Sequence, residues 1–193
     1  MSANHARYLV MPRPRLSDGT FEVRAVQPAD IEAIRQWRNA QMDMLRQNAP
    51  IEPQQQIDYF ARHIWPTMAH LQPFNILVSL CRDHQLIGYG GLVHIAWEHA
   101  RAEISFLLSP DRIHDEAVYA EDFSAFLSLM KQLAFEDLKL HRLFTETYDI
   151  RPHHISILES NGFIREGVLR DHVRINGQAI DSIFHGCLNQ HER

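Results

Sequence analysis

The sequence is poor in several features that define special protein classes. Its 193 residues include only two cysteines, eight glycines and nine prolines, and acidic side chains outnumber Lys and Arg by 24 to 19. So little glycine and proline, without a repeat, excludes collagen-like and low-complexity chains. The formal charge of −5 lacks the basic excess that is typical of nucleic-acid-binding proteins. We therefore expect no nucleic-acid partner.

Long hydrophobic runs are also lacking. No apolar stretch approaches the roughly 20 residues that span a bilayer. The apolar run from Tyr8 to Met11, which is followed by Pro12, is too short for the hydrophobic region of a signal peptide. These absences predict a cytoplasmic protein that has no membrane partner.

Motifs for metal binding or covalent catalysis are missing as well. Cys81 and Cys187 lie far apart and outside any CxxC motif, and their apolar, strand-like surroundings predict buried free thiols in a reducing compartment. The 13 histidines form neither an HExxH motif nor a zinc-type Cys/His spacing, so we expect no metal. Neither a GxSxG motif nor a Walker A loop is present.

The remaining composition is that of a globular domain. Hydrophobic residues make up 45% of the chain and charged residues 22%, which is ordinary for a folded domain. Residues 1–20 contain Pro12, Pro14 and Gly19 and show no periodicity, so they are predicted to form an N-terminal extension. Residues 21–193 are predicted to form one domain.

Apolar periodicity predicts an alternation of strands and helices. The expected strands cover residues 21–26, 74–81, 86–97, 102–108, 141–148, 163–173 and 179–187. The expected helices begin near residues 30, 53, 117 and 152. Pro66 should shorten or kink the second helix, and Asn176-Gly177 is the strongest hairpin signal. This order predicts an α+β fold with a mixed sheet rather than a regular βαβ repeat.

The order of elements over residues 21–188 resembles that of the GNAT acyltransferase fold. Residues 101–110 look like the fourth strand of that family, residues 134–143 like the end of its central helix, and residues 157–163 like its last helix. Residues 166–177 with Asp181-Ser182 resemble the terminal hairpin of the branch that contains ribosomal-protein and spermidine acetyltransferases. The resemblance implies a mostly antiparallel sheet that has helices on both faces and is splayed between the fourth and fifth strands.

The resemblance also implies acetyl-CoA as the co-substrate. Its pantetheine arm would lie along the fourth strand at Phe106, Leu107 and Leu108, as an added strand would. Its pyrophosphate would meet the start of the central helix, where free N–H groups and the helix dipole bind anions. The residues expected there and at the last helix are Arg112, His114, Ala117, Arg151 and Leu158.

The pyrophosphate loop departs from the family pattern Gln/Arg-x-x-Gly-x-Gly/Ala. The nearest stretch is Arg112–Ala117, in which Asp115 stands at a glycine position and Glu116 adds a second negative charge. A carboxylate at a helix start stabilises the free helix and opposes a pyrophosphate in the same place. Either a rearranged loop brings Arg112 or His114 to the phosphates, or the domain binds another ligand.

Three side chains are candidates for acid–base catalysis. An amine must be neutral to attack a thioester, so a base must take its proton and a donor must protonate the departing thiolate. The resemblance places Glu103 near the acceptor as the base; the alternative is a solvated strand end paired with Arg101. His153 and His154 are the candidate donors, because Leu158 stands at the family's tyrosine position and imidazole titrates near neutrality. They alternatively cap or pack the helix start.

The acceptor-side candidates are Trp37, Arg38, Asn39, Tyr89 and Trp97. The first two helices and the third strand form the acceptor wall in this branch, and an aromatic floor suits a sugar or nucleotide. The same aromatic residues equally suit core packing. These features resemble GNAT proteins of surface-polysaccharide pathways, including those that acetylate nucleotide-linked amino sugars.

The sequence therefore predicts an acetyl-CoA-dependent N-acetyltransferase that acts on a primary amine of a small molecule by direct attack on the thioester. We favour an amino-sugar nucleotide as the acceptor over a protein N-terminus. The alternative, suggested by Asp115 and Leu158, is a catalytically inactive GNAT-like binding module. The expected oligomeric state is a monomer or a homodimer.

Overall fold

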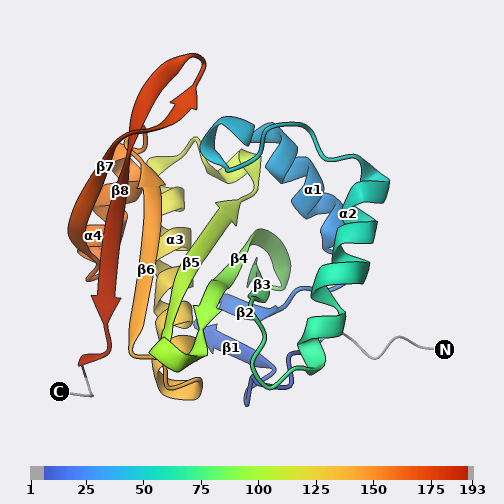
Figure 1. Cartoon of the computed structure of the whole chain (residues 1–193). Coiled ribbons are helices and arrows are strands. Elements are labelled where there is room, and N and C mark those ends of the chain that lie inside the picture. Colours follow the sequence, from blue (N-terminus) through green and yellow to red (C-terminus); the bar gives the residue numbers. More distant parts are fainter. Residues whose placement is uncertain (1–6, 191–193) are drawn as a thin grey trace.

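A computed structural model describes residues 7–190, which form an eight-stranded sheet with helices on both faces (Figure 1). The strands are β1 (Arg15–Asp18), β2 (Phe21–Ala25), β3 (Ile76–Arg82), β4 (Gln85–Ala96), β5 (Arg101–Leu108), β6 (Arg142–Tyr148), β7 (Ile164–Ile175) and β8 (Gln178–Leu188). The helices are α1 (Ile31–Ala40), α2 (Pro53–Tyr59), α3 (Glu116–Lys131) and α4 (Pro152–Ser160). The strand order is β1-β2-β3-β4-β5-β6-β8-β7, in which only the β5–β6 pair is parallel. The predicted α+β class, with a mostly antiparallel sheet and helices on both faces, is confirmed.

The N-terminal segment contributes to the sheet and to its core. β1 pairs with β2 in antiparallel register, and Tyr8, Met11 and Leu16 are almost fully buried. The hydroxyl of Tyr8 accepts a hydrogen bond from the backbone N–H of Leu77 at 3.0 Å. Of the predicted extension, residues 7–20 therefore pack on the domain, whereas residues 1–6 lie outside the described part.

Helices α2 and α3 both end in a π turn. α2 ends at Tyr59 and passes through one π turn, Phe60–Ile64, into a 3₁₀ turn that begins at Pro66. α3 ends at Lys131 and also continues as a π turn, Gln132–Asp137. Pro66 thus ends the second helical segment in the way the sequence predicts.

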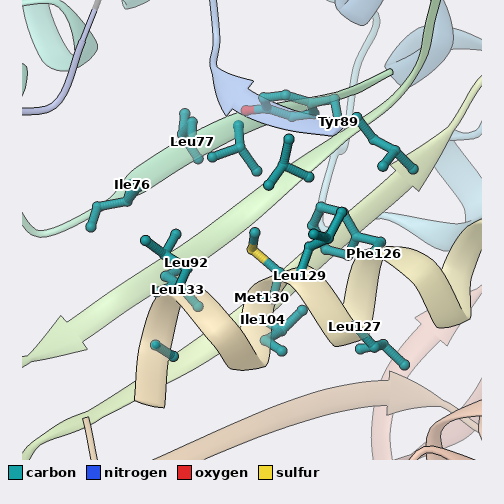
Figure 2. Close-up of a cluster of buried hydrophobic side chains, with 14 of the residues drawn as sticks. Ile76, Leu77, Tyr89, Leu92, Ile104, Phe126, Leu127, Leu129, Met130 and Leu133 are labelled. Carbon is teal, nitrogen blue, oxygen red and sulfur yellow. The ribbon is translucent and has the colours of Figure 1, made fainter. Parts of the chain in front are cut away.

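The main core lies between the sheet and α3. Figure 2 shows Phe126 and Met130 of α3, and Leu133 of the π turn that follows it, packed against the face of β3–β5 that carries Leu92 and Ile104. Tyr89 and Leu77 lie on the opposite face, which is covered by α1 and α2 (Figures 1 and 2). The sheet is therefore buried on both faces, which accounts for the continuous apolar sequence of β3.

The two cysteines differ in their burial. Both are free thiols; Cys81 is buried as predicted, but Cys187 is only half-buried. Burial raises the pKa of both thiols, and this disfavours the nucleophilic thiolate.

The parallel pairing of β5 with β6 is short. It joins residues 101–103 to residues 142–144, and beyond Glu103 and Phe144 the strands separate (Figure 1). β6 continues instead in a full antiparallel pairing with β8, which is inserted between β6 and β7. The Asn176-Gly177 turn, with φ of 50° and 80°, closes the β7–β8 hairpin as predicted. The predicted splay is therefore present between β5 and β6.

Gly90 supplies a test of this packing. A Cβ atom at this position would lie 2.1 Å from the carbonyl oxygen of Ser105 on β5 and 2.9 Å from Cζ of Phe126 on α3. We expect Gly90→Ala to lower the free energy of unfolding by about 2 kcal/mol or more, because both the sheet and α3 must shift. Urea denaturation measures this change. Gly167→Ala is the matched control, since a Cβ there meets no atom within 4 Å; equal losses in the two variants would contradict the packing.

Candidate active site

A cavity of about 290 Å³ lies where β5 and β6 separate. Residues from both faces of the sheet line it, because β5 and β6 are not paired there and the gap between them opens to both faces. Six of the predicted site residues line it: Arg38, Tyr89, Glu103, Phe106, Arg151 and His154. Residues of the irregular segment after α1 and of β6 complete the wall.

Glu103 lies at the point where the pairing ends and is 8% exposed. Oε1 of Glu103 accepts a hydrogen bond from Nη2 of Arg46 at 3.1 Å, and Oε2 lies 2.8 Å from Nδ1 of His94. The alternative pairing with Arg101 is not formed, because the Arg101 guanidinium lies over the Phe144 ring. Glu103 is therefore a carboxylate held in the cavity by two neighbouring side chains.

A second carboxylate faces Glu103 across the splay. Nη2 of Arg46 also donates to Glu146 on β6, so one guanidinium joins a carboxylate of β5 to a carboxylate of β6. His172 of β7 approaches Glu146 at 3.5 Å. This side of the sheet thus holds a network of alternating charges at the cavity wall.

The opposite side of the cavity is less charged. The Phe106 ring stacks on Phe123 of α3 with a centroid distance of 4.5 Å. Along β5 the N–H of Ser109 points to β4, where it bonds the carbonyl of Ile87, so alternation leaves the backbone groups of Phe106 facing β6. Oγ1 of Thr145 is buried there without a hydrogen-bond partner among residues 7–190. These groups fit the amide-bearing pantetheine arm of coenzyme A.

His154 is held at the cavity by α3. Its Nδ1 lies 2.8 Å from the Tyr119 hydroxyl, and its ring stacks on Phe123 at a centroid distance of 4.2 Å. Nη2 of Arg151 donates to the same hydroxyl at 2.7 Å. Burial, and then the nearby Arg151 charge, lower the pKa of His154 well below its ordinary value. His154 is therefore a neutral imidazole near physiological pH.

The N–H groups of Ala117 and Val118 at the start of α3 are already hydrogen-bonded. The Asp115 carboxylate caps the helix and accepts from the backbone N–H of Ala117 and of Val118. Arg112 is bound to the fully buried carboxylate of Asp122, and His114 is exposed. The splay thus fits the pantetheine arm, whereas this helix start does not fit a pyrophosphate bound in the usual way.

Four other predicted residues are part of the packing rather than of the cavity. Leu107, Leu108 and Leu158 are buried in the core, and the carbonyl oxygen of Leu108 accepts from Nε2 of Gln41. Nε2 of His153 lies 3.0 Å from the backbone oxygen of Glu116. A contact between His153 and the α3 start agrees with the capping alternative.

The acceptor-side candidates also separate into two groups. Arg38 and Tyr89 line the cavity and, together with Tyr59, an adjoining cavity of about 470 Å³. Trp37 packs against the core. The Asn39 amide bonds both backbone groups of Ile51, and Nε1 of Trp97 donates to the carbonyl of Pro73. These three side chains hold structure together in the described fold.

Sequence reasoning missed several residues of the site, among them Arg46, His94, Glu146, Tyr119, Tyr59 and Thr145. Glu146 could have been predicted from the sequence, because it lies on the strand (residues 141–148) that was expected to lie beside residues 102–108. Arg46 lies in an irregular segment, and His94 adopts φ of 51° near the end of β4, so no periodicity marks them. Tyr119 reads from the sequence as an ordinary core residue of α3.

Two features are absent from residues 7–190: a metal-ligating cluster and a membrane-spanning helix. No three His, Cys, Asp or Glu side chains in this part of the chain are grouped so that they could hold a metal ion. Its helices are all too short or too polar to cross a membrane.

Comparison with known proteins places this architecture. The sequence matches the family described as the acetyltransferase (GNAT) domain over residues 23–184. Similar solved structures include spermidine N-acetyltransferase from Vibrio cholerae in complex with CoA and spermine, with 20% identity, a TM-score of 0.75, and coverage of 89% of this chain and 96% of that chain. A probable acetyltransferase is 21% identical with a TM-score of 0.71 and covers 93% of this chain and 98% of its own. A comparison with curated proteins finds no match.

The chain therefore belongs to the GNAT acetyltransferase family, since the match covers most of its length. It is an N-acetyltransferase of the GNAT type, and acetyl-CoA is its co-substrate. The predicted fold class, enzyme class and co-substrate are confirmed.

The buried imidazole makes the stability of the protein depend on pH. The pKa of His154 is lower in the folded state than its ordinary 6.5, so below that pH the unfolded chain binds more protons and the free energy of unfolding falls. We expect His154→Gln to reduce this fall between pH 6.5 and about pH 5 by as much as ~1.4 kcal/mol per pH unit. Urea denaturation across this range measures it. His99→Gln, in an exposed side chain, should keep the wild-type slope; the same slope in both variants would contradict a neutral His154.

Proposed function

We propose that the protein transfers the acetyl group of acetyl-CoA to a primary amine, with Glu103 as the general base. The observation that carries the proposal is the position of the Glu103 carboxylate. It is buried in the cavity at the point where β5 and β6 part, so an amine and a thioester entering from opposite faces of the sheet would meet beside it. No covalent enzyme intermediate is needed, because neither Cys81 nor Cys187 lines the cavity.

The two proton transfers of the reaction take place at opposite ends of the cavity. Glu103, oriented by His94 and Arg46, takes the proton of the attacking amine directly or through water. His154 lies at the other end and donates a hydrogen toward the leaving sulfur. Bound acetyl-CoA supplies the thioester carbonyl that the amine attacks. The backbone of Phe106 and the unpartnered Thr145 hydroxyl orient the pantetheine arm.

We further propose an amino-sugar nucleotide as the acceptor. The similar Vibrio cholerae structure contains spermine. A polyamine is positively charged, however, so an unpaired arginine in the acceptor cavity would repel it. Arg38 lines both cavities and has no carboxylate within ion-pair distance among the described residues; its Nε donates to Gln47. An unpaired guanidinium suits a phosphate group, and the adjacent rings of Tyr59 and Tyr89 suit a sugar or a base.

A second candidate function, a GNAT-like module that binds without catalysis, is favoured by one observation. The Asp115 carboxylate uses the α3 N–H groups to which the family's pyrophosphate would bind. A module of this kind would show no turnover of acetyl-CoA with any amine.

The base is tested by Glu103→Gln. We expect kcat to fall about 10²- to 10⁴-fold, which is the contribution of one acid–base group, while calorimetry shows an unchanged micromolar affinity for acetyl-CoA, roughly −8 kcal/mol. The assay panel contains an amino-sugar nucleotide, spermine and a peptide with a free N-terminus. Glu98→Gln, at an exposed site outside the cavity, is the matched control.

Each outcome of that panel decides a separate point. Unchanged kcat in Glu103→Gln would contradict the proposed base. Acetylation of spermine or of the peptide, without acetylation of the amino-sugar nucleotide, would contradict the proposed acceptor.

The helix cap is tested by Asp115→Gly. This change frees the N–H groups of Ala117 and Val118 at the cost of a few tenths of a kcal/mol in stability. We expect a tighter complex with coenzyme A by calorimetry, because the pyrophosphate no longer competes with a carboxylate. Weaker binding would instead mean that the acidic loop forms part of the working site.

A further inference from the structure

Tyr119 on α3 is hydrogen-bonded to two residues of the cavity wall, Arg151 and His154. The hydroxyl of Tyr119 lies 2.7 Å from Nη2 of Arg151 and 2.8 Å from Nδ1 of His154. We propose that Tyr119 is a positioning residue which, held by Arg151, fixes His154 as the tautomer that carries its hydrogen on Nε2. His154 thereby offers an N–H donor to the sulfur of the bound co-substrate. This inference rests on the proposed acetyl transfer.

The direction of each hydrogen bond follows from the chemistry of the three groups. A guanidinium has donors only, so Arg151 donates to the Tyr119 oxygen. If the hydroxyl accepted from an Nδ1–H instead, its own hydrogen would have no acceptor among residues 7–190, because Arg151 and His154 are its hydrogen-bond partners there. A buried hydroxyl keeps its hydrogen bonded, so it donates that hydrogen to Nδ1 of His154. Nδ1 is then the acceptor of a neutral imidazole, and the ring hydrogen must be on Nε2.

The surroundings of His154 keep the ring neutral. Phe123 stacks on one side with an interplanar angle of 13°, and the side chain is 8% exposed. The charged or titratable groups around it are Tyr119 on α3, Arg151 just before α4, His153 on α4, and His185 on β8. None of these is a carboxylate, so none stabilises an imidazolium.

Nε2 is the nitrogen left available to a ligand. His154 lines the cavity, and Nε2 has no hydrogen-bond partner in the part of the chain from residue 7 to residue 190. Leu158, one turn further along α4, has no polar atom and is fully buried. The donor function at this end of the cavity therefore falls to His154.

The proton balance closes without a charged imidazole. As the carbon–sulfur bond breaks, His154 passes the Nε2 proton to sulfur and receives the Tyr119 hydroxyl proton on Nδ1. The negative charge then lies on the Tyr119 oxygen, beside the Arg151 guanidinium. The proton that the amine lost to Glu103 returns to solvent, and solvent restores the Tyr119 hydroxyl.

The tautomer is measured by long-range ¹H–¹⁵N NMR on the protein without co-substrate, and His154→Gln identifies the signal. We expect wild-type His154 to carry its hydrogen on Nε2. In Tyr119→Phe, Nδ1 loses its donor, so the fraction of the Nε2–H tautomer should fall below that of the wild type. Tyr148→Phe is the matched control for the tautomer, because Tyr148 lines the same cavity and does not contact His154.

Activity gives a second readout of the same proposal. We expect kcat to fall about 100-fold in Tyr119→Phe, on the scale of one general acid, with little change in KM for acetyl-CoA. An Nδ1–H tautomer in the wild type, or a tautomer ratio unchanged in Tyr119→Phe, would overturn the inference. A wild type without turnover would overturn the proposed function instead, because the NMR result does not depend on turnover.

Discussion

The parallel pairing between β5 and β6 stops after three residues, and the rest of the site depends on this interruption. A continuous ladder would close the sheet and leave no passage between its faces. Because the strands part, backbone groups of β5 and the Thr145 hydroxyl of β6 are left for a ligand. Helices α1 and α2 on one face, and α3 and α4 on the other (Figure 1), then supply different side chains to the two mouths of a single cavity.

The two mouths of the cavity differ in the charged groups that line them. Towards α1 and α2, Arg46 is shared by Glu103 and Glu146, and imidazoles flank both carboxylates. Towards α3 and α4, hydrogen bonds link Tyr119, Arg151 and His154, and none of these three is a carboxylate. Such a division suits a reaction in which a proton is taken up at one end and given out at the other.

Much of the fold was predictable because its signals are local. Apolar periodicity placed seven of the strands and all four helix starts, and Asn176-Gly177 needs only its own backbone to make a turn. β1 was missed because four residues show too little alternation. The site was predicted in part: Glu103 and His154 lie on regular elements, whereas Arg46 reaches the cavity from an irregular segment. Trp37 and Trp97 illustrate the converse, since a sequence does not distinguish an aromatic wall from core packing.

The hydrogen bond between Tyr8 and Leu77 has a consequence for how the chain assembles. These residues are 69 positions apart, so during synthesis Tyr8 emerges long before its partner strand β3 exists, as do the buried Met11 and Leu16. Their apolar surface stays exposed to water until β3 has been made. The folding unit therefore begins earlier in the chain than the family match at residue 23, and a truncation at that boundary would uncover one edge of the core.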